Sequence, residues 1–112
     1  MADPPDQSLQ DAVAALWRDA RPRALERVAA LEDAVEALRA DALDADTATA
    51  ATGEAHKLAG ALGTFGMPEG TTQARAIERA LTAGATVADA PALAERVALL
   101  RAVVEGGADA AA

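Results

Sequence analysis

His56, the one histidine of the chain, is the residue best suited to chemistry, because a neutral imidazole offers a nucleophilic nitrogen near neutral pH. It lies in segment 54–66, which reads EAHKLAGALGTFG. Apolar residues in this region recur at helical spacing, which predicts an amphipathic helix from about Thr47 to Thr64, with the seam Ala51, Ala55, Leu58, Leu62 and Phe65. At about 100° per residue, His56 falls about 140° from the centre of this seam, on the side that faces water.

The residues predicted to surround His56 on this exposed side are small: Thr52, Ala59, Gly60 and Gly63. Each glycine inside a helix costs roughly 1 kcal/mol relative to alanine. An exposed imidazole with so little around it favours a group that another macromolecule reaches. We therefore predict that these four residues form a partner-docking surface. The alternative is that Gly60 and Gly63 permit close packing between helices.

A carboxylate is predicted to lie beside this histidine. His56 precedes the turn at 66–67 by about 15 Å of helix, and Glu78 follows that turn by about 16 Å on the next helix. Glu78 lies on a flank of its helix, where its carboxylate can accept a hydrogen bond from Nδ1–H of His56 and leave Nε2 unprotonated. Gln73 falls on the opposite flank, and Arg75 points to solvent. The alternative is a surface ion pair between Glu78 and Arg75 or another base.

The composition indicates one helical domain. A chain of 112 residues can bury a single core, and its alanine, leucine and valine content favours helices over sheets. The net charge of −8 disfavours nucleic acid as a partner, and the absence of cysteine excludes disulfides and thiolate zinc sites. One histidine also disfavours a histidine-built metal centre. No apolar run approaches about 18 residues, and the acidic start is unlike a signal peptide, so we expect a cytoplasmic protein without a membrane partner.

The predicted fold is all-α: an antiparallel up-down-up-down four-helix bundle with a short additional N-terminal helix. The short helix begins at Ser8 and ends near residue 20, because Pro22 disfavours helix at the residue before it. Long helices are predicted from Pro22 to about Leu43, then over 47–64 and 68–83, and a last one that Gly106–Gly107 stops. Trp17 and Phe65 are predicted core residues, and the arginines and glutamates of 21–41 a solvated face. Residues 1–7 are predicted to be disordered, 8–106 to form the bundle, and 107–112 to fray.

Two segments of the chain carry a resemblance to a known family. AHKLAGALGTFG at 55–66, followed by ARAIE at 74–78, resembles the histidine-containing phosphotransfer (HPt) domains of two-component signalling. The His-x-Leu-x-Gly core, with glycines seven and ten residues after the histidine, is a fairly specific signature. The likeness extends more loosely from Leu9 to Val104. It implies a helical bundle whose exposed histidine takes a phosphoryl group from a receiver-domain aspartate, or from a kinase, and passes it on.

The resemblance also implies roles for individual residues. His56 is the phosphoacceptor, Gly60 clears space for the partner, and Glu78 bonds the imidazole. One departure is Ala59, where many members carry lysine or arginine near the incoming phosphate. Lys57 is then the only nearby base, about 100° around the helix from His56. The phosphoryl charge is expected to depend more on the partner's lysine and magnesium, which predicts slower or partner-dependent transfer.

The sequence therefore predicts a phosphocarrier that relays a phosphoryl group through His56 and is not an enzyme with an active site of its own. The expected partners are a receiver domain of a response regulator and a hybrid histidine kinase. The chain is expected to be monomeric and to hold no metal or cofactor, with Mg²⁺ bound by the partner receiver. The alternative is a non-catalytic helical scaffold or dimerisation module derived from an HPt domain, which would be indifferent to substitution of His56.

Overall fold

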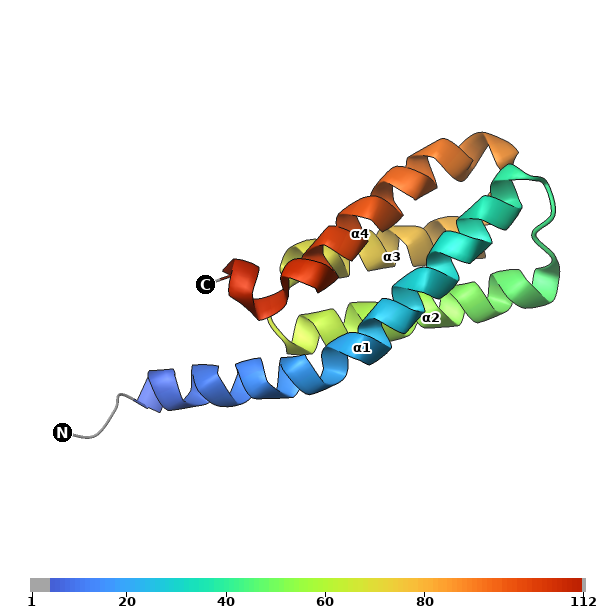
Figure 1. Cartoon of the computed structure of the whole chain (residues 1–112). Coiled ribbons are helices and arrows are strands. Elements are labelled where there is room, and N and C mark those ends of the chain that lie inside the picture. The colour runs from blue at the N-terminus through green and yellow to red at the C-terminus, as the bar shows by residue number, and fades with distance from the viewer. Residues whose placement is uncertain (1–4, 112) are drawn as a thin grey trace.

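The computed structural model describes residues 5–111 of the chain. They form four α-helices and one 3₁₀ turn, joined by short connections. No strand occurs in this range, so the predicted all-α class is confirmed. Figure 1 shows the chain reversing direction at each connection between long helices. In this arrangement α2 packs against α1 and α3, and α4 packs against the same two helices. The elements are α1 (Pro5–Arg39), α2 (Ala45–Thr64), α3 (Pro68–Thr82), η1 (Val87–Asp89) and α4 (Ala90–Ala111).

The predicted division between a short helix and a first long helix is wrong. Residues 8–20 belong to α1, which continues through Pro22. Proline removes a backbone donor and crowds the carbonyl four residues earlier, which kinks a helix but does not always end it. Figure 1 shows that α1 is bent in its blue section and that the part before the bend extends beyond the other helices. Contacts beyond the local sequence hold this region: the Arg21 guanidinium donates to the carbonyls of Val104 at 3.2 Å and Glu105 at 2.7 Å.

The ends of the chain also differ from the predicted boundaries. Residues 1–4 and 112, within the segments predicted to be disordered and frayed, lie outside the described residues. Residues 5–7 are already helical. At the other end, Gly107 has φ 55° and ψ −148°, so the predicted stop is a kink with helical residues on both sides.

Local side-chain chemistry explains the connections on either side of α2. The Asp44 carboxylate accepts a hydrogen bond from the Thr47 backbone N–H at 2.7 Å, which is the cap expected at the start of a helix. This hydrogen bond lowers the pKa of the Asp44 carboxyl. Pro68 opens α3 directly after the turn, and Gly84, at φ +83°, follows its end as predicted.

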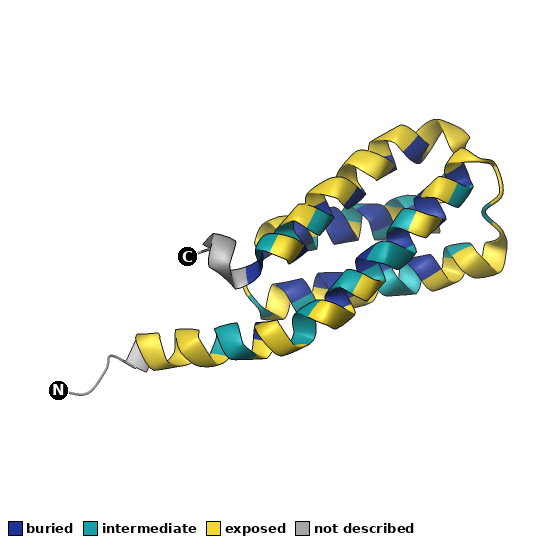
Figure 2. Cartoon of the chain, in the orientation of Figure 1, coloured by how far each residue is buried: buried dark blue, intermediate teal, exposed yellow. Residues whose placement is uncertain are grey.

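The core is a continuous apolar cluster to which all four helices contribute. Figure 2 shows the buried positions along the faces that the helices turn toward one another. Trp17 and the half-buried Phe65 close one end, with ring centroids 5.2 Å apart in an edge-to-face arrangement. The largest fully buried side chains are Val28, Leu31, Leu58, Leu62, Ile77, Val97, Leu100 and Val104.

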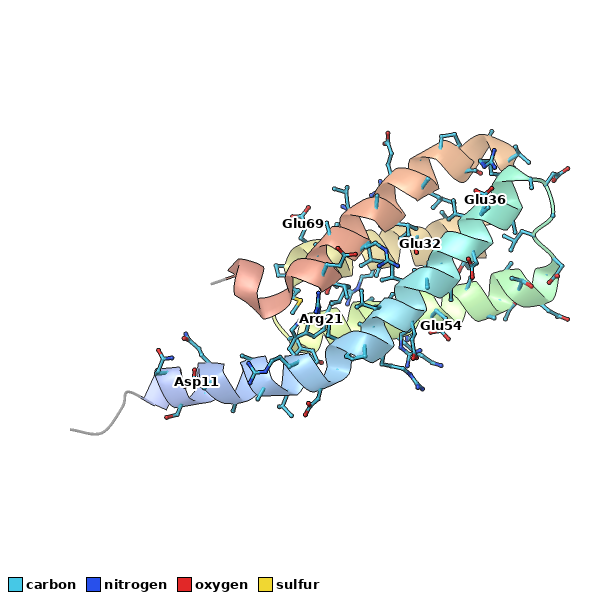
Figure 3. All side chains as sticks on the ribbon, viewed as in Figure 1. Asp11, Arg21, Glu32, Glu36, Glu54 and Glu69 are labelled. Carbon is cyan, nitrogen blue, oxygen red and sulfur yellow. The ribbon has the colours of Figure 1, made fainter. Side chains whose placement is uncertain are left out.

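The charged face of α1 is not simply solvated, as was expected for residues 21–41. Arg101 of α4 forms two hydrogen bonds of 2.7 Å with the Glu32 carboxylate, and Arg27 pairs with Glu54 of α2. Figure 3 labels Arg21, Glu32 and Glu54. The Arg101 guanidinium holds the pKa of the Glu32 carboxyl below its usual value. These pairs join α1 to both of its neighbours. Within residues 5–111, no helix combines the length and apolarity that a membrane span needs.

The kink at Gly107 generates a stability prediction. A Cβ at this position would lie 2.1 Å from Nε1 of Trp17, and the positive φ is already strained for an L-residue. Gly107→Ala should therefore lower the free energy of unfolding by about 1–3 kcal/mol. Urea denaturation followed by the fluorescence of the chain's one tryptophan measures this change.

Gly53→Ala provides the matched control, because a Cβ at Gly53 meets no atom within 4 Å. That variant should raise the free energy of unfolding by up to about 1 kcal/mol through helix propensity. Equal stabilities for the wild-type chain and Gly107→Ala would contradict the packing described for Trp17.

Candidate functional site

His56 lies in the middle of α2, on the side opposite the buried seam. Ala51, Ala55, Leu58 and Leu62 are each no more than 4% exposed, and they fix the rotation of α2 about its axis. The imidazole consequently faces water, with 75% of the side chain exposed. The predicted exposure of His56 is confirmed.

Glu78 of α3 approaches the imidazole from one side. Its Oε2 lies 2.9 Å from Nδ1 of His56, which is hydrogen-bonding distance. An ionised carboxylate can only accept, so this contact favours the tautomer in which Nδ1 carries the hydrogen and Nε2 of the neutral ring holds the lone pair. The predicted contact is therefore present. Among the described side chains no ion pair joins Glu78 to Arg75, which was the alternative.

The small residues around His56 differ in exposure. Gly60 and Gly63 are exposed and Thr52 is half-buried, with its hydroxyl donating to the Ala48 carbonyl at 2.8 Å. Ala59 is only 5% exposed, so its expected place on the open surface is wrong. It is covered because α3 packs against this side of α2, where the Thr71 hydroxyl donates to the Ala59 carbonyl at 3.3 Å.

The glycines near His56 are not needed for packing within the chain. A Cβ at Gly60 would meet no atom within 4 Å, and one at Gly63 would make an ordinary 3.7 Å contact with the Thr71 hydroxyl. The alternative that both glycines permit close helix packing is therefore not supported. Gly60 leaves bare surface one turn of helix from the imidazole.

His56 and Glu78 line an open recess of about 600 Å³ between α2 and α3. Ala59 and Gly60 of α2 also line this recess. Two arginines of α3, which were not predicted to belong to the site, line it as well. These are Arg75 and Arg79. Arg75 is exposed, as predicted, yet it borders the same space as the imidazole. The spacing could have revealed it, because Arg75 precedes Glu78 by three residues and so lies on the same flank of α3.

Lys57 lies on the other side of His56, toward α1. It lines two hollows between α1 and α2 in company with Arg23 and Arg27, and it does not line the recess that holds His56 and Glu78. The expectation that Lys57 is the only base near His56 is therefore wrong. Within the described residues, no group of three or more histidine, aspartate or glutamate side chains is placed to hold a metal ion.

In a comparison with protein-family models, residues 15–106 match the model described as Hpt domain. The match includes all of α2 and α3, and with them every residue of the recess. Searches of curated proteins and of solved structures found no match.

The hydrogen bond to Glu78 predicts the tautomer of the imidazole. In the neutral ring, Nδ1 should carry the proton and Nε2 should be free, and Glu78→Ala should remove this preference because it deletes the acceptor. Long-range ¹H–¹⁵N NMR reports the tautomer directly, and a chain with one histidine gives a single set of ring signals.

Glu69→Ala is a suitable control, since Glu69 is an exposed carboxylate in the first turn of the same helix. It should leave the ring signals unchanged. A neutral wild-type ring protonated at Nε2 would show that Glu78 does not set the tautomer.

Proposed function

The chain belongs to the family of Hpt domains, and we propose that His56 is the residue through which it relays a phosphoryl group. Members of this family carry phosphoryl groups on histidine in two-component phosphorelays. For this chain, the proposed donor is a receiver-domain aspartyl phosphate or a histidine kinase, and the proposed acceptor is the receiver domain of a response regulator. The observation that supports this proposal most directly is the exposed imidazole of His56. Its Nδ1 is within hydrogen-bonding distance of Glu78, so Nε2 remains accessible to a phosphoryl donor.

The proposed transfer is an in-line displacement at phosphorus. The lone pair of His56 Nε2 forms the N–P bond while the P–O bond to the donor aspartate breaks, and the bonding pair leaves with the carboxylate oxygen. The ring keeps its Nδ1 proton and gains positive charge, which the Glu78 carboxylate 2.9 Å away stabilises. Transfer onward to an acceptor aspartate reverses these bond changes.

The domain supplies positioning, and the partner supplies the remaining machinery. Phosphoryl transfer depends mostly on alignment and charge stabilisation, so a fixed imidazole on a rigid helix is a sufficient contribution from the carrier. We propose that Mg²⁺ and the acidic pocket belong to the receiver, and that this chain has no catalytic activity alone. We also propose that the chain is monomeric and cytoplasmic and that residues 8–106 form its antiparallel bundle.

A non-catalytic scaffold or dimerisation module is the alternative function. Leu9 and Leu16 favour it, because these large apolar side chains of α1 are 65% and 60% exposed. A scaffold role, however, explains neither the hydrogen bond between His56 and Glu78 nor the bare surface at Gly60. Phosphotransfer accounts for both, and we therefore favour it.

Incubation with a phosphorylated receiver domain tests the role of His56. The wild-type chain should gain one phosphoryl group that is labile in acid and stable in base, as expected of an N–P bond, and His56→Ala should gain none. His56 is exposed, so its substitution should change stability by no more than about 0.5 kcal/mol, which circular dichroism can verify. Receivers encoded by the same genome form the panel. Labelling that persists in His56→Ala would overturn the assignment.

Gly60 tests whether the bare surface beside His56 serves docking. Gly60→Arg should leave the fold intact but slow transfer by more than about tenfold, because a long side chain on this surface obstructs the receiver. Gly60→Ala is the matched control and should transfer normally while gaining up to about 1 kcal/mol of helix stability. Phosphotransfer assays that are quenched at set times, with one receiver, compare the transfer rates of the wild-type chain, Gly60→Arg and Gly60→Ala. Normal transfer by Gly60→Arg would show that the receiver does not approach over Gly60.

A further inference from the structure

A phosphoryl group on His56 raises a charge problem that the residues of α2 do not solve. The group brings about two negative charges at neutral pH to a site that already holds the Glu78 carboxylate. The chain as a whole carries a net charge of −8. At Ala59, on the same side of α2 one turn from His56, there is no charge, and Lys57 lies toward α1. A cation of this chain that stabilises the phosphorylated state between encounters with partners must therefore come from another helix.

The register between α2 and α3 shows which residue of α3 is level with Ala59. His56 contacts Glu78, and seven residues nearer the turn on each helix, Gly63 lies beside Thr71. The two helices run in opposite directions at the same rise of about 1.5 Å per residue, so residues between these pairs also match in height. Three residues from His56 toward the turn is Ala59, and three residues from Glu78 toward the turn is Arg75.

Arg75 is also on the correct flank of α3 and is available for an anion. At three residues from Glu78 it lies about 60° further toward solvent on the same flank of α3, and it lines the recess with His56 and Gly60. It is exposed and forms no ion pair with any carboxylate of residues 7–107. Arg79 lines the recess too, but it lies further around α3, away from α2.

We propose that Arg75 binds the phosphoryl group on His56 and supplies, from α3, the positive charge that α2 lacks at Ala59. The inference rests on the proposed phosphoacceptor role of His56. A guanidinium suits this position because its planar set of donors matches phosphate oxygens and keeps its charge at every physiological pH. Ala59, the residue of α2 that is level with Arg75, carries no charge of its own. Arg75 is thus a phosphate-binding residue, with Glu78 holding the ring.

Phosphorylation by phosphoramidate tests this assignment without a protein partner. Nε2 of His56 attacks phosphorus, the P–N bond of phosphoramidate breaks and ammonia leaves, so any change in rate arises in this chain alone. Arg75→Ala should be phosphorylated about threefold to tenfold more slowly than the wild-type chain, because a charge-assisted contact to the incoming group is lost. In ³¹P NMR titrations of the phosphorylated chains, Arg75→Ala should also show a higher phosphoryl pKa, a change that a purely structural role would not produce.

The conservative variant gives the sharpest result. Arg75→Lys should keep most of the rate and keep the phosphoryl pKa near that of the wild-type chain, since it retains a cation at the same exposed position on α3. Arg39→Ala is the matched control: it removes the same charge from an exposed pair with Glu36 at the far end of α1, and it should behave as wild type.

The outcomes separate this inference from the proposed function. If the wild-type chain takes up no phosphoryl group on His56, the proposed function is wrong and the role of Arg75 falls with it. If the wild-type chain is phosphorylated but Arg75→Ala matches it in rate and phosphoryl pKa, only the role of Arg75 is wrong. An effect of Arg79→Ala as large as that of Arg75→Ala, or a loss in Arg75→Lys as large as in Arg75→Ala, would likewise contradict the assignment.

Discussion

The rotation of α2 about its own axis is the constraint on which the site depends. Ala51, Ala55, Leu58 and Leu62 are held in the core by α1 and α3, and a helix that turned to bury His56 would have to expose this apolar seam. Burial of such a seam is the main stabilising term available to a chain without cysteines. The exposure of the imidazole is thus a by-product of core packing. No local interaction at His56 is needed to hold the ring outward, and Glu78 only orients it.

The second constraint is the short turn between α2 and α3, which sets their register. The tight connection at 65–67 leaves little freedom for the two helices to slide, so equal distances from the turn bring residues to equal heights. The pairing of His56 with Glu78 follows from this register, as does the position of Arg75 beside Ala59. One connection therefore determines which acidic and basic groups surround the imidazole.

Much of the site could be predicted from the sequence, because helical periodicity and residue counting across a short turn are local quantities. They gave the outward direction of His56 and its contact with Glu78. Other features depend on tertiary contacts. The continuation of α1 through Pro22 accompanies the hydrogen bonds of Arg21 to carbonyls of α4, more than 80 residues away in the chain. The burial of Ala59 similarly reflects how closely α3 packs against α2, which no spacing along one helix reveals.

The position of the imidazole on one exposed side of α2 has a kinetic consequence for the proposed carrier role. One nitrogen with one direction of approach can meet only one protein at a time, so donor and acceptor must alternate and no ternary complex can form on this face. Under this proposal, the phosphorylated chain has to persist in water between its two encounters. The distance over which it can carry the phosphoryl group then depends on the rate of spontaneous hydrolysis relative to diffusion to the next receiver. The groups that border the ring influence that hydrolysis rate.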